Sequence, residues 1–470
     1  MRYISTRGSA PVLDFRGALL AGLASDGGLY VPQSIPQFSP QHISAMAGLS
    51  YTELAVEIMT PFVGDFVSRA EFTRMVAAAY GNFRHAAIAP ITQLSHDHFL
   101  LELFHGPTLA FKDFALQLLG HLLEHALKGE KKRSVILGAT SGDTGSAAIA
   151  GCAGRDIAIV ILYPEGRTSE VQRKQMTTVP DANVHALGVD GTFDDCQAIV
   201  KQLFTDEKLR AEINLLAVNS INWARVMAQI VYYFYAALAL GAPARRVNFC
   251  VPTGNFGDIF AGYMAQKMGL PMGTLVIASN ANNILARAVG TGTYAQTGVR
   301  PTLSPSMDID ISSNFERLLF DLHGRDGARM AGRMEEFSAS KSLTLSPAQH
   351  TDLRSMFAAH AVDDAATLAQ IRTIYATTGQ LLDPHTAVGV AATEALHRGH
   401  NKLLCPLGPP LGPTVTLATA HSAKFPDAVR EATGLTPALP AHLADLYDRP
   451  ERITRIGRDA GDVARYIGAL

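Results

Sequence analysis

Short runs of Val, Ile and Leu alternate with longer amphipathic stretches over much of this chain. The first four apolar runs are Ser134–Leu137, Ile157–Leu162, Asn183–Leu187 and Asn214–Val218. Stretches with helical character separate or follow them, at Thr144–Ala153, Ser169–Thr177, Phe193–Phe204 and Asn222–Leu240. Strand, helix and strand at this spacing indicate right-handed crossovers and a parallel sheet covered on both faces. The pattern resumes with Val247–Val251, a helix after Gly257, Thr274–Ala278, and a run at Thr414–Thr419 before a helix starting near Lys424.

The first 90 residues lack this alternation. Their helical periodicity lies near Phe15–Leu23, Tyr51–Phe62 and Arg69–Tyr80. A chain of 470 residues is also too long for a single core. We therefore expect an α/β protein with two open, mainly parallel domains: an N-terminal helical addition over residues 1–90, a smaller domain over 91–240, and a larger domain over 241–470 with a helical insertion at about 321–379.

Composition narrows the class of protein. Hydrophobic residues make up 47% and charged residues 17%, which is enough for a large buried interior. The formal net charge is -2 without a long basic run, so we expect neither a nucleic-acid partner nor a membrane surface. The four cysteines (Cys152, Cys196, Cys250 and Cys405) lack CxxC spacing, which predicts no metal site and fits a reducing cytoplasm. No apolar signal segment is evident at the N-terminus, and Val226–Ala242 contains Gln229 and three tyrosines, so it is expected to be a buried helix.

Lys112 is the first candidate for chemistry. Its neighbours Leu109, Ala110, Phe111 and Phe114 are apolar, so folding is expected to draw the ammonium out of water. Desolvation lowers the pKa of a lysine and leaves more free amine, which can condense with an aldehyde to form a Schiff base. The alternative is a lysine on an amphipathic helix whose charged group reaches solvent.

Two glycine-bearing loops follow predicted strands, where ligands of open parallel sheets bind. In Gly138–Gly145, the amides and hydroxyls of Ser141, Gly142 and Thr144 are suited to an amino-acid carboxylate at a helix N-terminus. Asp143 in the same loop is expected to cap the helix or face a cofactor ring. A generic strand-to-helix turn explains the glycines of this loop equally well.

The second loop, Pro252–Asp258, is suited to a phosphate monoester, because its backbone N–H groups form a nest ahead of a helix. It matches neither the dinucleotide fingerprint nor the Walker A pattern, which weakens a nucleotide-binding enzyme as a reading. A reactive lysine, a carboxylate loop and a phosphate loop together indicate pyridoxal 5'-phosphate as the cofactor.

The segment Gly106–Phe114 resembles the cofactor-lysine segment of the threonine synthases, in the tryptophan-synthase-β-like group of pyridoxal-phosphate enzymes. Further similar blocks cover nearly the whole chain: Tyr3–Gly8, Asp26–Pro32, Gly166–Ser169, Gln175–Val179, Gly191–Gln197, Asn219–Arg225, Gly254–Asp258, Asp383–Gly389 and Thr419–Phe425. The resemblance implies a fold type II enzyme with the cofactor in the cleft between the two domains.

The resemblance also implies roles for single residues. Lys112 corresponds to the Schiff-base lysine, and Gly254, Asn255, Phe256 and Gly257 to the phosphate loop. Thr419 is the candidate partner of the ring nitrogen. The Ser-Gly-Asp-Thr-Gly loop departs from the Ser-Gly-Asn of many relatives, so either Asp143 or Asn222 is expected near the ring hydroxyl.

The implied substrate is O-phospho-L-homoserine, converted with water to L-threonine and phosphate by γ-elimination and β-addition. Arg225 and Lys424 are candidates for binding its phosphate, with His105 and His421 as further hypotheses, although each could instead form an ordinary ion pair. The alternatives are a related lyase, such as a threonine dehydratase or a phosphohomoserine lyase, and a non-catalytic binding protein with the same fold. A cytoplasmic monomer or homodimer is expected.

Overall fold

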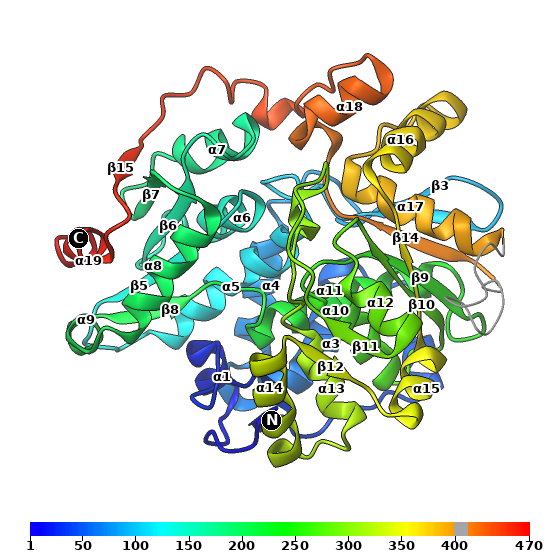
Figure 1. Ribbon diagram of the computed structural model, residues 1–470, viewed down its shortest axis with the longest axis horizontal. Coiled ribbons are helices and arrows are strands. Elements are labelled where there is room, and N and C mark those ends of the chain that lie inside the picture. The colour runs from blue at the N-terminus through cyan, green and yellow to red at the C-terminus, as the bar shows by residue number, and fades with distance from the viewer. Residues whose placement is uncertain (399–411) are drawn as a thin grey trace.

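Two sheets of mainly parallel strands lie side by side in the computed structural model, which describes residues 1–398 and 412–470 (Figure 1). The first sheet has five parallel strands in the order β15 (Thr454–Ile456), β7 (Val184–Val189), β6 (Ala158–Pro164), β5 (Ser134–Ala139) and β8 (Asn214–Ala217). The second has six strands in the order β13 (Phe357–Ala361), β10 (Met272–Ser279), β9 (Val247–Pro252), β14 (Thr414–Ala418), β4 (His98–Glu102) and β3 (Ile91–Gln93). Among the described strands of this sheet, only β3 runs antiparallel to its neighbour. The expected mainly parallel α/β fold is confirmed.

Helices cover both sheets, and a helical N-terminal addition packs beside them. The addition contains α1 (Phe15–Ala21), α2 (Pro40–Ala45), α3 (Tyr51–Val63) and α4 (Arg69–Tyr80), with a small antiparallel pair β1 (Tyr3–Ser5) and β2 (Tyr30–Pro32). The helices around the first sheet are α5 (Lys112–Ala126), α6 (Asp143–Cys152), α7 (Glu170–Thr177), α8 (Phe193–Thr205), α9 (Glu207–Glu212) and α19 (Ala460–Gly468). Those around the second are α10 (Trp223–Ala239), α11 (Gly257–Lys267), α12 (Ile284–Thr291), α13 (Phe315–Leu322), α14 (Gly327–Ser340), α15 (Pro347–Met356), α16 (Asp364–Thr378), α17 (Pro384–His397) and α18 (Pro426–Thr433), together with the strand pair β11 (Thr293–Ala295) and β12 (Ser342–Thr344).

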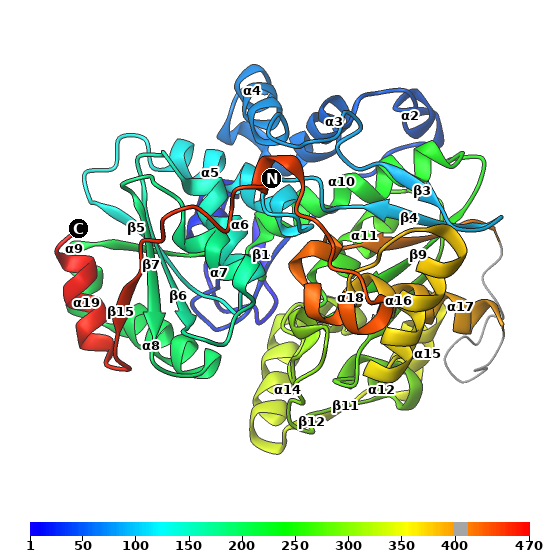
Figure 2. The ribbon, with the colours of Figure 1, turned by 90° about the horizontal axis from the view of Figure 1, so that it is seen from above.

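Two segments cross the expected domain boundaries. Strands β3 and β4 lie after residue 90 but pair within the second sheet, beside β14. Strand β15 and helix α19, near the C-terminus, return to the first sheet, and Figure 2 shows this segment running from α18 across to β15. Sheet membership depends on pairing between distant parts of the chain, which local periodicity does not encode.

The expected helical insertion also contributes an edge strand to the second sheet. Within residues 321–379, β13 reads Phe-Ala-Ala-His-Ala and pairs in parallel with β10 at the edge of the second sheet. Its alanines are typical of helices, so composition alone hides this edge strand.

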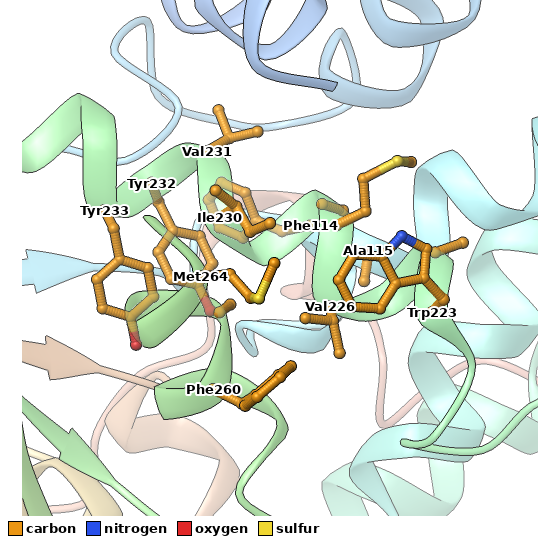
Figure 3. Packing of buried hydrophobic residues seen from close by; sticks show 14 of the residues in the cluster. Phe114, Ala115, Trp223, Val226, Ile230, Val231, Tyr232, Tyr233, Phe260 and Met264 are labelled. Carbon is orange, nitrogen blue, oxygen red and sulfur yellow. The ribbon is translucent and has the colours of Figure 1, made fainter. Parts of the chain in front are cut away.

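Helix α10 lies inside the protein, as expected for the apolar run at 226–242. Figure 3 shows its Val226 and Ile230 packed among Phe114 of α5 and Phe260 of α11. Among the described residues, no helix is long and apolar enough to cross a membrane. Cys152, Cys196 and Cys250 are buried free thiols, and Cys405 lies outside the described residues.

Candidate active site

Lys112 is the first residue of α5, and the chain just before it is fixed by the end of β14. The amide of Phe111 donates to the carbonyl of Thr419 at 2.8 Å, and the amide of His421 donates to the carbonyl of Leu109 at 3.0 Å. These bonds extend the second sheet to the start of α5. The lysine is therefore held where the two sheets meet.

The Lys112 side chain is 12% exposed. Its Nζ lies 3.4 Å from Asp143 Oδ2 and 3.4 Å from Ser306 Oγ. Burial lowers the pKa of Lys112; the positive charges of Lys424 and Arg225 add to this shift, and Asp143 opposes it. The predicted desolvation of Lys112 is confirmed, whereas its covalent role stays a prediction.

Asp143, the first residue of α6, accepts hydrogen bonds from the polar groups around Lys112. Its Oδ1 accepts from Lys424 Nζ at 2.8 Å and from Gln172 Nε2 at 2.8 Å, and its Oδ2 accepts from Ser306 Oγ at 3.0 Å. Burial disfavours its charged form, but Lys424 and Lys112 hold the pKa of Asp143 well below the usual value. The carboxylate is therefore ionised inside the protein.

Glycine at position 142 makes the contact between Gln172 and Asp143 possible. Gly142 has a φ of 145°, and a Cβ there would come within 2.4 Å of the Gln172 side chain. Gln172 also completes the capping box of α7 with Ser169. One glutamine thus fixes a helix start and orients the central carboxylate.

The rest of the Gly138–Gly145 loop offers hydrogen-bond donors. Thr140 Oγ1 accepts from the amides of Gly142 and Gly145, both at 2.9 Å, and holds the turn. The amides of Ser141, Asp143 and Thr144 donate to no other described residue. Three free N–H groups at a helix N-terminus are suited to a carboxylate.

The phosphate-loop residues form a second set of donors at the start of α11. Phe256 has a left-handed backbone with a φ of 63°, and it is the residue that precedes the helix. In the described part of the chain, the amides of Asn255, Phe256, Gly257 and Asp258 have no acceptor. The carbonyls of this loop are held, since Ser312 Oγ donates to Gly254 at 2.7 Å and Asn314 Nδ2 donates to Asn255 at 2.9 Å. These free N–H groups are suited to an anion, and phosphate binding by this loop stays a prediction.

Arg225 supplies a buried positive charge in the first turn of α10. Its side chain is buried, and its Nε and Nη1 have no hydrogen-bond partner among the described residues. Burial lowers the pKa of Arg225 to about 10. A buried guanidinium with free donors is a site for an anionic group of a ligand.

Other predicted residues have different surroundings. The carboxamide of Asn222 caps α10 by accepting from the amide of Ala224 at 3.0 Å and donates to the carbonyl of Leu19 at 2.8 Å, so it is engaged away from Asp143. His105 bonds Glu102 at 2.7 Å, and His421 caps a short 3-10 turn through the amide of Ala423. Thr419 is buried directly after β14, and its hydroxyl bonds no described residue.

Three further residues belong to this site, although sequence patterns did not indicate them: Gln172, Ser306 and His385. For His385 the sequence did offer one signal, because this residue lies within Asp383–Gly389, a block that resembles the threonine synthases. Ser306 lies in a loop without periodicity, and only the fold brings it to Lys112.

Comparisons with known proteins cover the whole chain. Residues 2–80 match the family model "Threonine synthase N terminus", residues 86–346 match "Pyridoxal-phosphate dependent enzyme", and residues 386–467 match "Threonine synthase, C-terminal". A threonine synthase of Pseudomonas aeruginosa is 53% identical over 99% of this chain and 98% of its own.

Solved structures similar to this chain include threonine synthases. The pyridoxal-phosphate-bound threonine synthase of Brucella melitensis is 51% identical with a TM-score of 0.95, covering 99% of this chain and 98% of its own. The threonine synthase of Escherichia coli is 32% identical with a TM-score of 0.82, covering 100% of both chains. The chain therefore belongs to the threonine synthase family of pyridoxal-phosphate-dependent enzymes.

Proposed function

We propose that this protein converts O-phospho-L-homoserine and water to L-threonine and phosphate. The observation that carries the proposal is the largely buried amine of Lys112, whose Nζ lies 3.4 Å from the ionised carboxylate of Asp143. In the described part of the chain, two sets of backbone N–H groups without acceptors and the buried guanidinium of Arg225, with two nitrogens without partners, complete the site. An amino-acid substrate with an anionic group at each end requires donors of this kind.

The residues present fit pyridoxal phosphate. The free amides of Asn255, Phe256 and Gly257 are suited to its phosphate, with Gly254 allowing the close packing of the loop. Thr419 is proposed to face the ring nitrogen, and Asp143 rather than Asn222 to lie near the ring hydroxyl, because the Asn222 carboxamide is already engaged. When bound, the cofactor supplies an aldehyde carbon for an amine and a conjugated ring that accepts electrons.

The chain's own groups bind the substrate at its two ends. The amides of Ser141, Gly142 and Thr144 are the candidates for its carboxylate, although Gly142 already donates to Thr140. Arg225 is the better candidate for its phosphate, since Lys424 is committed to Asp143 and to the carbonyl of Thr108 at 2.7 Å.

Lys112 is the group that moves protons. Burial lowers the pKa of Lys112, which favours the neutral amine that can act as a base. This amine takes the proton from Cα of the substrate and returns protons at Cβ. Burial between the two sheets limits stray water at this amine. Water then enters the reaction at Cβ.

The test combines a label with a product analysis. Borohydride reduction of the protein loaded with pyridoxal phosphate, followed by peptide mapping, should place the label on Lys112. Incubation with O-phospho-L-homoserine should yield threonine, and Lys112→Ala should abolish both results. Formation of 2-oxobutyrate instead of threonine would favour a phosphohomoserine lyase, and a label at another lysine would refute the assignment of Lys112.

We also propose a cytoplasmic location and a monomer or homodimer. Three buried cysteines kept as free thiols in the described residues are compatible with a reducing compartment. Light scattering of the purified protein would give its mass, and a tetramer or larger assembly would contradict this proposal.

A further inference from the structure

Ser306 lies against the reacting amine, in a short 3-10 turn over Pro305–Met307. Its Oγ donates to Asp143 Oδ2 at 3.0 Å and accepts from Lys112 Nζ at 3.4 Å. Lys112 Nζ also donates to the same Asp143 oxygen at 3.4 Å. The three polar atoms thus form a closed triangle.

The turn that carries Ser306 is held rigidly from two sides. The amide of Ser306 donates to His385 Nε2 at 3.1 Å, so this ring nitrogen must be an acceptor, and Nδ1 then donates to Asp383 at 2.8 Å. On the other side the phosphate loop packs closely, since a Cβ on Gly254 would lie 2.9 Å from the carbonyl oxygen of Ser306. The position of the hydroxyl is therefore set by residues from α17 and from the loop before α11.

A neutral amine has two N–H bonds and one lone pair. Ser306 Oγ and Asp143 Oδ2 can each accept one of the two N–H bonds of Lys112. The lone pair then points away from both acceptors. We propose that Ser306 is a positioning residue, whose hydroxyl orients the neutral Lys112 amine so that its lone pair faces the substrate Cα. This inference rests on the proposed function.

The proposal predicts a specific change in Ser306→Ala. With O-phospho-L-homoserine, kcat should fall at least about tenfold with KM little changed, because only the alignment of the base is lost. The primary isotope effect with substrate deuterated at Cα should rise, since proton removal becomes slower. Ser306→Thr keeps the hydroxyl and should restore most of kcat.

A second readout uses the cofactor-free full-length protein. Competitive labelling with acetic anhydride across a pH range, quantified on the Lys112 peptide, gives the pKa of this amine. Loss of an acceptor for the charged form should shift this pKa downward in Ser306→Ala. Ser134→Ala is the matched control. The Ser134 hydroxyl is also buried, has no hydrogen-bond partner among the described residues, and lies at the opposite, amino end of β5.

The outcomes distinguish a failure of the proposed function from a failure of the role proposed for Ser306. If the wild-type protein forms no threonine and takes no label on Lys112, the proposed function fails. If the wild type is active and Ser306→Ala leaves kcat, the isotope effect and the Lys112 pKa unchanged, only the role of Ser306 is refuted. The same result is reached if Ser306→Thr is as impaired as Ser306→Ala, since the hydroxyl would then not be the group that matters.

Discussion

At the scale of single residues, Asp143 is the charge on which the site depends. It neutralises the fully buried Lys424 and faces Lys112. In Asp143→Asn both ammonium groups lose this counter-charge, and an uncompensated buried charge costs about 3–5 kcal/mol. We therefore expect the free energy of unfolding of the cofactor-free protein to fall by about 3 kcal/mol in urea titrations.

Arg455 and Glu165 form a surface ion pair at 2.7 Å that serves as the control. The Arg455 side chain is 74% exposed, so Arg455→Met should change stability by less than about 1 kcal/mol. Removing the buried cation as well, in Asp143→Asn with Lys424→Met, should recover part of the loss. Equal losses in Asp143→Asn and Arg455→Met would contradict this account.

Single residues also show which parts of the site can be predicted from the sequence alone. Lys112 and the two glycine loops were predicted because each signal is local: apolar neighbours, or glycines between a strand and a helix. Ser306 and Gln172 were not, because their role comes from loops that meet only in the folded chain. The resemblance left either Asp143 or Asn222 near the ring hydroxyl, and only the fold shows that the Asn222 carboxamide already caps α10.

At the scale of elements, the start of α11 depends on the absence of a side chain at Gly254. A Cβ there would lie 2.9 Å from the Ser306 carbonyl oxygen and 3.2 Å from Met307 Cα. Gly254→Ala should displace the loop and weaken binding of pyridoxal phosphate at least about tenfold, as such overpacking costs about 1–3 kcal/mol. Titration of the cofactor followed by absorbance measures this.

Gly332→Ala provides the control for that experiment. Gly332 lies within α14, and outside the local backbone of that helix no atom of the described residues comes within 4 Å of a Cβ built there. Alanine favours a helix interior over glycine, so cofactor affinity should stay unchanged and stability should rise slightly. Weaker cofactor binding in both variants would show that the effect is not specific to the loop.

Helices α10 and α11 are joined by a buried carboxyl group. Asp258 Oδ1 accepts from Tyr232 at 2.5 Å and from Tyr233 at 2.9 Å, and the two tyrosines are seen on α10 in Figure 3. Burial raises the pKa of Asp258 from 3.8 to about 6, against the lowering effect of these bonds. Between about pH 4 and 6 the folded state keeps a proton that the unfolded state has lost, so stability falls as pH rises through this window.

Asp258→Asn should remove this contribution, which amounts to about 3 kcal/mol across the window. The difference in free energy of unfolding between wild type and variant, measured by urea titration at several pH values, should therefore change steadily from pH 4 to pH 6 and then level off. A difference independent of pH would show that Asp258 does not titrate there.

At the scale of the whole molecule, the two faces of the first sheet belong to different cores. Ile136, Ile159 and Ile161 point into the large core that continues through the second sheet, whereas Leu137 and Val160 belong to a separate cluster. Helix α19 closes this outer cluster with Ala460, Val463 and Ile467. Sequence periodicity predicted the sheet but not its C-terminal cover, because β15 and α19 are separated from β7 and α8 by more than 200 residues of chain.

The outer cluster should therefore depend on a segment far from the active site. Deleting residues 457–470 exposes the surface that Val463 and Ile467 cover, at a cost of about 3–6 kcal/mol for two large aliphatic side chains. Amide hydrogen exchange should become faster in β6 and β7, while β9 and β10, in the second sheet, keep their protection because stability is lost locally. Deleting Leu470 alone, which is 37% exposed, should leave exchange unchanged. Equal loss of protection in both sheets would mean instead that the two lobes unfold as one unit, and that the site between them is held by the stability of the molecule as a whole.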